Sequence, residues 1–467
     1  MGNGGHRMVE YGVLGAFAAM LVVTMGAGMP LWGSLLLGLA LFAGYGLYRG
    51  HTLGELGRMA LSGTRTIGGV LSLLVIIGMI TAAWRAAGTI PAIVCLSARL
   101  VSPRLYLLVA FLLCSGMSML MGTSFGASAT MGVICMSIAR AMGVDPALAG
   151  GAILAGAYCG DRCSPMSSSA SVVATITDSD LFDHVDRMIR TGAVPFVASC
   201  GLYAVVGSLT AGSGMVPDVA QAFVRVFDLS PVVPLPAVAV VVLSLCKVEV
   251  HKTMLVSLAL ALAICVGVQG VAVRDLPALL WGGFRVADPE LTHMIDGGGI
   301  VSMVEIVAII AIAASYAGLF EGTGLIAGMR GVVNGVSRRY TPFVGVLATS
   351  VCTSIISCEQ TLAVMLTQQL CGEVEGTGTA LALDLENSVV VVSALAPWSI
   401  GCAAILSFVS APATSVLWAF LLYLIPLWTL VLSWRERTDP AFVDSAAGHL
   451  FGLGAHDDAR RFRPAEA

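Results

Sequence analysis

The chain has 467 residues, of which 57% are hydrophobic and only 11% are charged. Soluble globular proteins carry about 25% charged residues, so this composition excludes a soluble enzyme and a disordered adaptor. The 24 basic and 28 acidic side chains give a net charge of −4, which provides no basic surface for nucleic acid. At about 20 residues per span, the length accommodates about 10–14 membrane-crossing segments.

Long runs without charged or histidine residues predict an all-α polytopic membrane protein. Unpaired backbone groups cannot face lipid, so such runs form spanning helices or broken helices buried among them. The first run, residues 11–48, is divided into two spans by the glycine-rich residues 26–30. Further runs cover residues 66–84, 105–139, 191–217, 253–273, 340–358 and 387–434.

Basic residues in short loops predict the orientation of the chain. Arg7 precedes the first span, and Arg49, Arg58 and Arg65 follow the second. Because such residues favour the cytoplasmic side, we expect both termini in the cytoplasm and the protein in the cell (inner) membrane. The arginine-containing residues 435–467 are expected to form a polar cytoplasmic tail.

Similar local sequences recur at a nearly constant spacing and suggest an internal duplication. Gly88-Thr89 matches Gly322-Thr323, Thr123-Ser124-Phe125 matches Ser357-Cys358-Glu359, and Pro165 matches Pro397. We therefore expect two inverted repeats with broken or re-entrant helices, an arrangement that places a transport site between the repeats. The boundaries expected are residues 1–212 and 228–434 for the repeats, 213–227 for the connecting loop and 435–467 for the tail.

Small and hydroxyl-bearing residues interrupt the apolar runs at residues 122–130, 156–169, 353–361 and 386–399. Unwound turns expose backbone carbonyls and hydroxyls, which suit Na+, while half-helix N-termini attract carboxylates. Small residues also permit close helix packing, so composition alone leaves both interpretations open. The acids beside the breaks favour an ion site.

Few charged residues lie at membrane depth, where burial of a charge is costly. Asp161 and Glu359 lie beside breaks and are expected to bind an ion or a proton. Glu386 is either a third such group or the last acid of a solvated loop. Arg85 and Arg162 are expected to act as charge partners of carboxylates or to receive a substrate carboxylate.

Two further patterns have alternative interpretations. Gly122-Thr123-Ser124-Phe125-Gly126 fits the nucleophile elbow of a serine hydrolase, but that chemistry requires a histidine. All seven histidines are expected in loops or tails, which disfavours an intramembrane hydrolase. Residues 178–190 predict an amphipathic helix at the membrane interface.

The motifs together resemble the NhaC-type Na+/H+ antiporters of the ion-transporter superfamily, over most of the chain. The motif residues are Trp84 to Ile90, Gly122 to Gly126, Gly156 to Pro165, Asp180 to His184, Glu359-Gln360, Leu385 to Ser388, and Pro397-Trp398.

This resemblance implies a secondary antiporter that exchanges Na+ or Li+ for protons, with no enzymatic activity and no cofactor beyond these ions. It implies an ion path lined by Thr123, Ser124, Asp161, Ser164, Glu359, Gln360, Glu386 and Ser388. Asp161 and Glu359 would form the Na+ site and bind Na+ and H+ in competition.

Two departures from the family pattern keep a second function open. Ser168 and Asn387 stand where the family often has aspartate, while Arg85 and Arg162 add positive charge. Relatives with these motifs exchange Na+ and H+ together with malate or lactate, so small carboxylates are an alternative substrate. A passive channel is disfavoured because broken repeats with acids suit alternating access. Ion selectivity, stoichiometry and homodimer formation stay open.

Overall fold

The computed structural model describes residues 3–26, 29–66, 68–100, 102–164, 167–210, 223–246, 248–286, 296–323, 341–375 and 378–439. Within these ranges the chain is helical apart from turns, and its β-structure is limited to an isolated bridge between Phe284 and Gly297. The prediction of an all-α fold is confirmed. Pro165, most of the expected connecting loop and most of the polar tail lie outside the described residues.

The helices of the first half follow the predicted interruptions. The run at residues 11–48 forms two helices, and the later runs form helices that stop at the small-residue segments. Their bounds are α1 (Asn3–Gly26), α2 (Leu31–Tyr48), α3 (Leu53–Thr66), α4 (Gly68–Ala86), α5 (Thr89–Leu100), η1 (Pro103–Leu105), α6 (Tyr106–Met121), α7 (Ser124–Ala127), the π-helix η2 (Ser128–Gly132), α8 (Val133–Ala141), α9 (Pro146–Cys163), α10 (Ser168–Thr177) and α11 (Leu181–Thr210).

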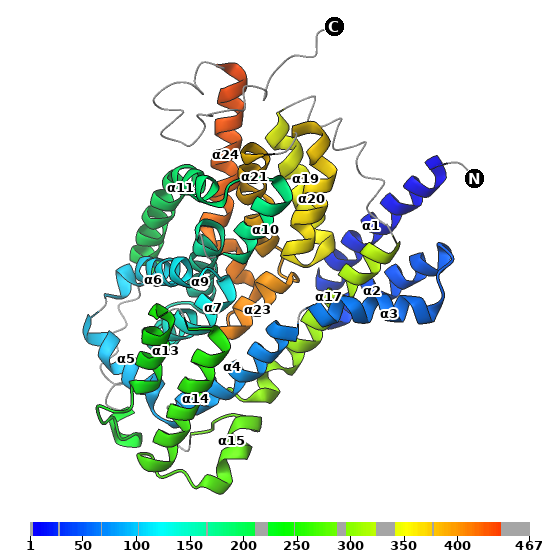
Figure 1. Ribbon diagram of the computed structural model, residues 1–467. Helices are drawn as coiled ribbons and strands as arrows, with labels where there is room; N and C mark the ends of the chain where they lie inside the picture. The colour runs from blue at the N-terminus through cyan, green and yellow to red at the C-terminus, as the bar shows by residue number, and fades with distance from the viewer. Residues whose placement is uncertain are drawn as a thin grey trace.

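The second half presents a similar order of long and broken helices. Its elements are α13 (Leu235–Leu245), α14 (Val250–Gly267), η3 (Val273–Asp275), α15 (Leu276–Gly282), η4 (Ile300–Met303), α17 (Val304–Thr323), α19 (Pro342–Ser357), α20 (Gln360–Glu375), α21 (Thr379–Asn387), α22 (Val389–Val392), η6 (Ser393–Leu395), α23 (Ile400–Phe408), η7 (Ala413–Trp418) and α24 (Phe420–Thr438). In Figure 1, α6, α9, α11 and α24 lie together on one side, and α1, α2, α3 and α17 on the other.

Membrane-spanning helices are present in both halves. Among the described residues, four helical segments are long and apolar enough to cross a bilayer unaided: Pro103–Met121, Leu181–Thr210, Val250–Gly267 and Ile300–Phe320. The helices of Thr379–Leu395 and Ile400–Phe408 make a further span bent by 58°. Shorter apolar helices, including Leu71–Ala86, accompany them. The chain is therefore a polytopic membrane protein, while the total of 10–14 segments stays a prediction.

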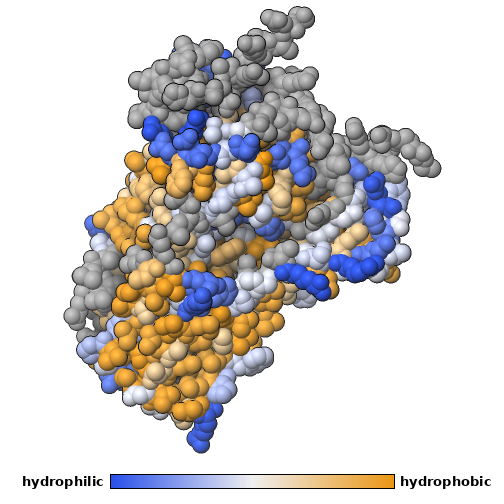
Figure 2. All heavy atoms as spheres, in the orientation of Figure 1, coloured by the Kyte–Doolittle hydropathy of each residue, from blue (hydrophilic) through white to orange (hydrophobic). Residues whose placement is uncertain are grey.

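The outer surface has the composition expected for contact with lipid. Large apolar side chains such as Leu112 on α6, Val197 on α11 and Leu255 on α14 are exposed. Figure 2 shows apolar residues covering the face over α13 and α14, with hydrophilic residues toward the upper edge and at the lower tip. Lipid contact explains this exposure, since soluble monomers rarely expose large continuous apolar areas.

Helix α3 differs from its neighbours because it is amphipathic and carries charged residues. A capping box fixes its start: the backbone N–H of Thr52 donates to Glu55 Oε2 at 2.8 Å, and the N–H of Glu55 donates to Thr52 Oγ1 at 3.3 Å. These bonds to Thr52 lower the pKa of the Glu55 carboxyl.

The predicted breaks are present, and each helix that follows one has a side-chain cap. Thr123 Oγ1 accepts the N–H of Gly126 at the start of α7, and Ser167 Oγ accepts that of Ala170 in α10. In the second half, Glu359 caps α20 and Ser399 caps α23. Because the freed N–H groups lie away from bulk water, such caps satisfy them at little cost.

Helices of each half pack against helices of the other half. Helix α4 packs against α14 and α15, while α17 packs against α2 and α3. The motif around Trp84 joins the halves, since Trp84 Nε1 donates to Ser257 Oγ at 3.0 Å and Thr89 Oγ1 to the carbonyl of Val233 at 2.9 Å. These contacts are those expected of paired repeats, and the repeat boundaries stay a prediction.

Close packing of α6 against α9 depends on two glycines spaced four residues apart, Gly156 and Gly160. A Cβ atom at Gly160 would lie 2.0 Å from the backbone carbon of Ser118, and one at Gly156 would lie 2.7 Å from the carbonyl oxygen of Phe111. Small residues at this spacing allow membrane helices to approach closely. Since Asp161 follows Gly160 directly, this contact also fixes the position of that acid.

Gly160→Ala is expected to lower the free energy of unfolding by about 1–3 kcal/mol, because the added methyl group forces α6 and α9 apart. Thermal unfolding of the purified protein in detergent measures the effect. Gly116→Ala is the matched control, since a Cβ atom there meets nothing within 4 Å. Equal melting temperatures for the two variants would contradict the packing argument.

Candidate ion-binding site

The acid predicted to bind an ion, Asp161, lies in the last turn of α9, where three interrupted helices meet. Its side chain is buried, with 4% of its surface exposed. Gln360 Nε2, at the start of α20, donates to Asp161 Oδ2 at 3.2 Å, and the backbone N–H of Ser124 donates to the same carboxyl group. The contacts of Asp161 thus come from both halves of the chain.

Serine side chains at the start of α10 bind the backbone of Asp161. Ser169 Oγ donates to its carbonyl oxygen at 2.8 Å, and Ser167 Oγ donates to the same oxygen. This carbonyl belongs to the freed end of α9. The predicted path residue Ser164 is buried nearby, and its hydroxyl donates to the carbonyl of Met119 at 2.9 Å.

The second predicted acid, Glu359, has a structural role in this conformation. Its two carboxylate oxygens accept the N–H groups of Thr361 and Leu362 at 3.0 and 2.6 Å. It therefore caps α20 and is half-buried. Both Glu359 and Asp161 act electrostatically on the buried hydroxyl of Tyr158, so the two acids share a neighbourhood, but it is Gln360 that contacts Asp161 directly.

Arg162 follows Asp161 in the chain but binds a different set of residues. Its guanidinium donates to Cys163 Sγ at 3.1 Å, to Thr191 Oγ1 at 3.2 Å and to Asn387 Oδ1. Only 1% of Arg162 is exposed, and the described residues place no carboxylate within 4.0 Å of it. The expected pairing of Arg162 with Asp161 is therefore absent from this conformation.

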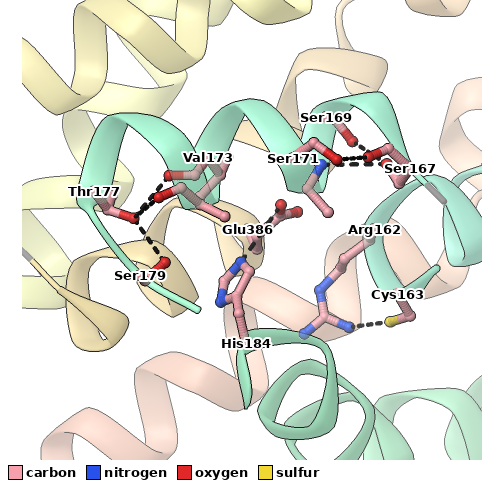
Figure 3. A network of polar contacts seen from close by, with 12 residues as sticks. Arg162, Cys163, Ser167, Ser169, Ser171, Val173, Thr177, Ser179, His184 and Glu386 are labelled. Atoms are coloured by element: carbon pink, nitrogen blue, oxygen red, sulfur yellow. Dashed lines mark hydrogen bonds and ion pairs between the residues drawn. The ribbon is translucent and has the colours of Figure 1, made fainter. Parts of the chain in front are cut away.

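A buried acid and a buried histidine face Arg162 from two other helices. His184 Nε2 lies 3.7 Å from Glu386 Oε1, and neither side chain has any exposed surface. Figure 3 shows Arg162, His184 and Glu386 pointing into one space between α10 and α11. Glu386 also interacts electrostatically with Arg162. Glu386 therefore belongs to the protein interior, and the alternative of a solvated loop is wrong.

Several atoms in this space have no hydrogen-bond partner among the described residues. They are both nitrogens of His184, both carboxylate oxygens of Glu386, Nε of Arg162 and Nδ2 of Asn387. Buried polar atoms are ordinarily satisfied, so a group of unsatisfied ones is unusual for a protein interior. We refer to these four residues as the α11–α21 charge cluster.

One sequence-based expectation about this region is wrong. His184 is in a helix and fully buried, whereas all histidines were expected in loops or tails. The predicted amphipathic helix is the first part of α11, which continues without interruption from Leu181 to Thr210, and its position at the membrane interface stays a prediction. Its first turns bury Val185 and Met188 and expose Phe182.

The remaining predicted residues occupy other positions around the breaks. Thr123 caps α7, and Ser388, at the junction of α21 and α22, donates to the carbonyl of Asp384 at 2.6 Å and accepts from Ser350 Oγ at 3.0 Å. Arg85 is in the last turn of α4 and lines a separate cavity with Arg140. The structure thus brings Ser124, Asp161 and Gln360 together and separates them from Arg85.

Comparison with known proteins agrees with this architecture. A family model described as the Na+/H+ antiporter family matches residues 7–186 and 156–434, which together span nearly the whole membrane region. The chain belongs to the Na+/H+ antiporter family. Its matched segments overlap at residues 156–186, the stretch that contains Asp161, Arg162 and His184.

Three known antiporters resemble the chain at about the same level. A malate-2H+/Na+-lactate antiporter of Bacillus subtilis is 26% identical, over 83% of this chain and 85% of its own length. The Na+/H+ antiporter NhaC of Alkalihalophilus pseudofirmus is 26% identical, over 78% and 81%. An arginine/ornithine antiporter of Halobacterium salinarum is also 26% identical, over 88% of each chain.

His184 and Glu386 are expected to show energetic coupling, because each is the only ionisable partner within 4.0 Å of the other in the described structure. In a double-mutant cycle, His184→Gln and Glu386→Gln should deviate from additivity by about 0.5–3 kcal/mol in unfolding free energy. Thermal unfolding in detergent provides the values.

The control pairs Glu386→Gln with Asp183→Asn, which changes the exposed neighbour of His184. That pair should add within about 0.5 kcal/mol. Additivity of the His184 and Glu386 variants would show that the 3.7 Å approach has no energetic consequence.

Proposed function

We propose that the protein exchanges Na+ or Li+ for protons across the cell membrane by alternating access, and that Asp161 carries both cations in turn. One observation supports Asp161 above the other acids. It is buried, and the described residues place no arginine, lysine or histidine within 4.0 Å of its carboxylate. Its hydrogen-bond partners, the side chains of Gln360 and Ser169 and the backbone N–H of Ser124, are all neutral.

A buried carboxylate without a cationic partner requires neutralisation. Leaving it ionised and unpaired costs several kcal/mol, so it binds either a proton or a metal cation. These two loads exclude each other on the same oxygens. On one side of the membrane the carboxylate releases a proton and binds Na+. On the other side it releases Na+ and binds a proton, so the two cations are exchanged without ATP.

Oxygen ligands for Na+ are available around Asp161. The amide oxygen of Gln360 remains free to coordinate while its Nε2 donates to the acid. The hydroxyl of Ser124 and the freed carbonyl groups at the ends of α6 and α9 complete the set that we propose. Hard oxygen ligands at broken helices suit an alkali cation.

We assign the other predicted residues supporting roles. Glu359 and Thr123 hold the starts of α20 and α7, and Ser388 holds the junction of α21 and α22. Arg162 keeps positive charge close to Glu386, so the α11–α21 charge cluster is unfavourable for a second alkali cation.

Orientation and localisation are part of the proposal. Helix α1 begins and α24 ends in the upper half of Figure 1, which supports placing both termini on one side. Arg7 in the first turns of α1, and Arg435 and Arg437 in the last turn of α24, support the cytoplasmic side of the cell membrane. A transporter of this kind works within the lipid bilayer and needs no enzymatic activity or bound cofactor.

Exchange that includes a small organic anion is the second candidate. Two relatives are named for malate and lactate or for arginine and ornithine, so substrates vary among similar chains. The observation in its favour is the guanidinium of Arg85, which has no ion-pair partner within 4.0 Å among the described residues. The sodium/proton exchange is preferred because the Asp161 site lies at the junction of the broken helices.

Asp161→Asn is expected to abolish Na+-dependent proton release, because an amide cannot alternate between a proton and a cation. The measurement uses inside-out vesicles from an antiporter-deficient host, acidified inside and loaded with a pH-sensitive dye. Addition of Na+ or Li+ should release protons with the unmodified protein. Asp183→Asn, which changes an exposed acid on α11, should retain release.

Proton release by Asp161→Asn equal to that of the control would overturn the assignment of Asp161. No response of the unmodified protein to Na+ or Li+, but a response in the presence of malate or lactate, would replace the proposed function with anion-coupled exchange.

Gln360→Leu is expected to raise the Na+ concentration for half-maximal exchange about tenfold or more. Its amide donates to the ionised form of Asp161, and such bonds to a charged group contribute about 1.5–3 kcal/mol. Without this hydrogen bond, protons compete better with Na+ for Asp161. The rise in the half-maximal Na+ concentration should therefore become smaller as the pH is raised. A pH-independent defect would contradict this role.

A further inference from the structure

A small cavity lies where α4, α8 and α23 end, apart from the residues that contact Asp161. Its volume is about 20 Å³, and its lining includes Arg85, Arg140, Thr81 and Ser137. None of the residues that line it carries an acidic side chain. Ser410, at one edge, is exposed, so the cavity lies close to the surface of the protein.

Arg140 is held in place by the end of α23. Its Nη2 donates to the carbonyl oxygen of Ser410 at 2.6 Å and to that of Val409 at 3.4 Å. These bonds use one of the guanidinium nitrogens and provide no negative countercharge. Among the described residues, the donors on Nε and Nη1 of Arg140 have no hydrogen-bond partner and are left for another one.

The side chain of Arg85 has no hydrogen bond or ion pair within the described parts of the chain, although the residue is only partly exposed. A tight turn packs against it: a Cβ atom at Gly298 would lie 2.9 Å from Arg85 Nη1. Asp296 attracts it from the same turn, but Asp296 Oδ1 accepts the N–H of Val286 at 2.7 Å. A guanidinium has five N–H donors, and those of Arg85 have no acceptor among the residues that the structure describes.

The two arginines line the same space, and the charge of Arg140 acts unfavourably on that of Arg85. Bringing two cations together in a partly desolvated place is costly unless an anion lies between them. The hydroxyls of Thr81 and Ser137 donate to carbonyls of their own helices at 3.0 and 2.8 Å. Recognition of a ligand therefore falls to the guanidinium groups.

We propose that the cavity between Arg85 and Arg140 is a binding site for a small anion, either a halide or the carboxylate group of an organic acid. Guanidinium groups are suited to carboxylates because their planar donors form paired hydrogen bonds. A space of about 20 Å³ exceeds the 10–15 Å³ or so that one water molecule needs. It admits one small group and excludes a large one.

The site stands independently of sodium/proton exchange at Asp161. The segment α7–η2–α8 connects the two places: its first residue, Ser124, adjoins Asp161, and Arg140 is in its last turn. An anion at Arg140 and a cation at Asp161 therefore bind at opposite ends of one broken helix.

Thermal unfolding of the full-length protein in detergent tests the proposal. Chloride, acetate, L-lactate and L-malate are titrated separately at constant ionic strength in a buffer whose own anion is a bulky sulfonate. We expect a saturable rise in melting temperature with at least one of them, since a ligand that binds the folded state stabilises it. A response to chloride alone assigns a halide site, and one to the organic acids assigns a carboxylate site.

Arg85→Gln and Arg140→Gln should each lose this rise, while Arg104→Gln, which changes an exposed arginine, should keep it. Ser137→Leu fills the cavity without removing a charge and should also abolish the anion-dependent rise in melting temperature. This variant provides the test if an arginine variant fails to fold. Asp161→Asn should keep the rise, so failure of the exchange mechanism is distinguishable. A rise that persists in the arginine variants and in Ser137→Leu, or no rise with any anion, would overturn the proposal.

Discussion

The structure depends on the need to satisfy backbone groups where helices stop inside a low-dielectric protein. Each of four breaks is followed by a side-chain cap: Thr123, Ser167, Glu359 and Ser399. Because such caps need short oxygen-bearing side chains, the breaks gather hydroxyls and a carboxylate. The same groups suit a bound cation, so the chemistry that permits a break also prepares a site.

Much of the architecture follows from the sequence, since charge-free runs and small-residue interruptions have direct physical consequences in a membrane. The two helices in residues 11–48, the interruptions around Thr123 and Glu359, and the burial of Asp161 belong to this class. Family membership was predictable from the sequence motifs. The motif residues Trp84 and Asp161 make tertiary contacts in the structure. Exposed surface facing lipid was likewise implied by composition alone.

Partner choice was not predictable, because it depends on side-chain direction at positions adjacent in the chain. Asp161 and Arg162 are neighbours, yet one contacts Gln360 and the other Thr191 and Asn387. The burial of His184 depends on which face of α11 packs inward, and the sequence pattern of that segment did not reveal this face. The motif from Asp180 to His184 was the available signal for His184. Arg140 gave no signal, since only folding brings it beside Arg85.

The lack of a cationic side chain within 4.0 Å of Asp161, among the described residues, has a consequence for bioenergetics. If this carboxylate is the one group that alternates between loads, each turnover moves one monovalent cation in each direction. The net charge transferred across the bilayer is then zero. Membrane voltage supplies no driving force under that condition, and the direction of exchange depends only on the two concentration gradients. Such a protein would keep working in a depolarised cell.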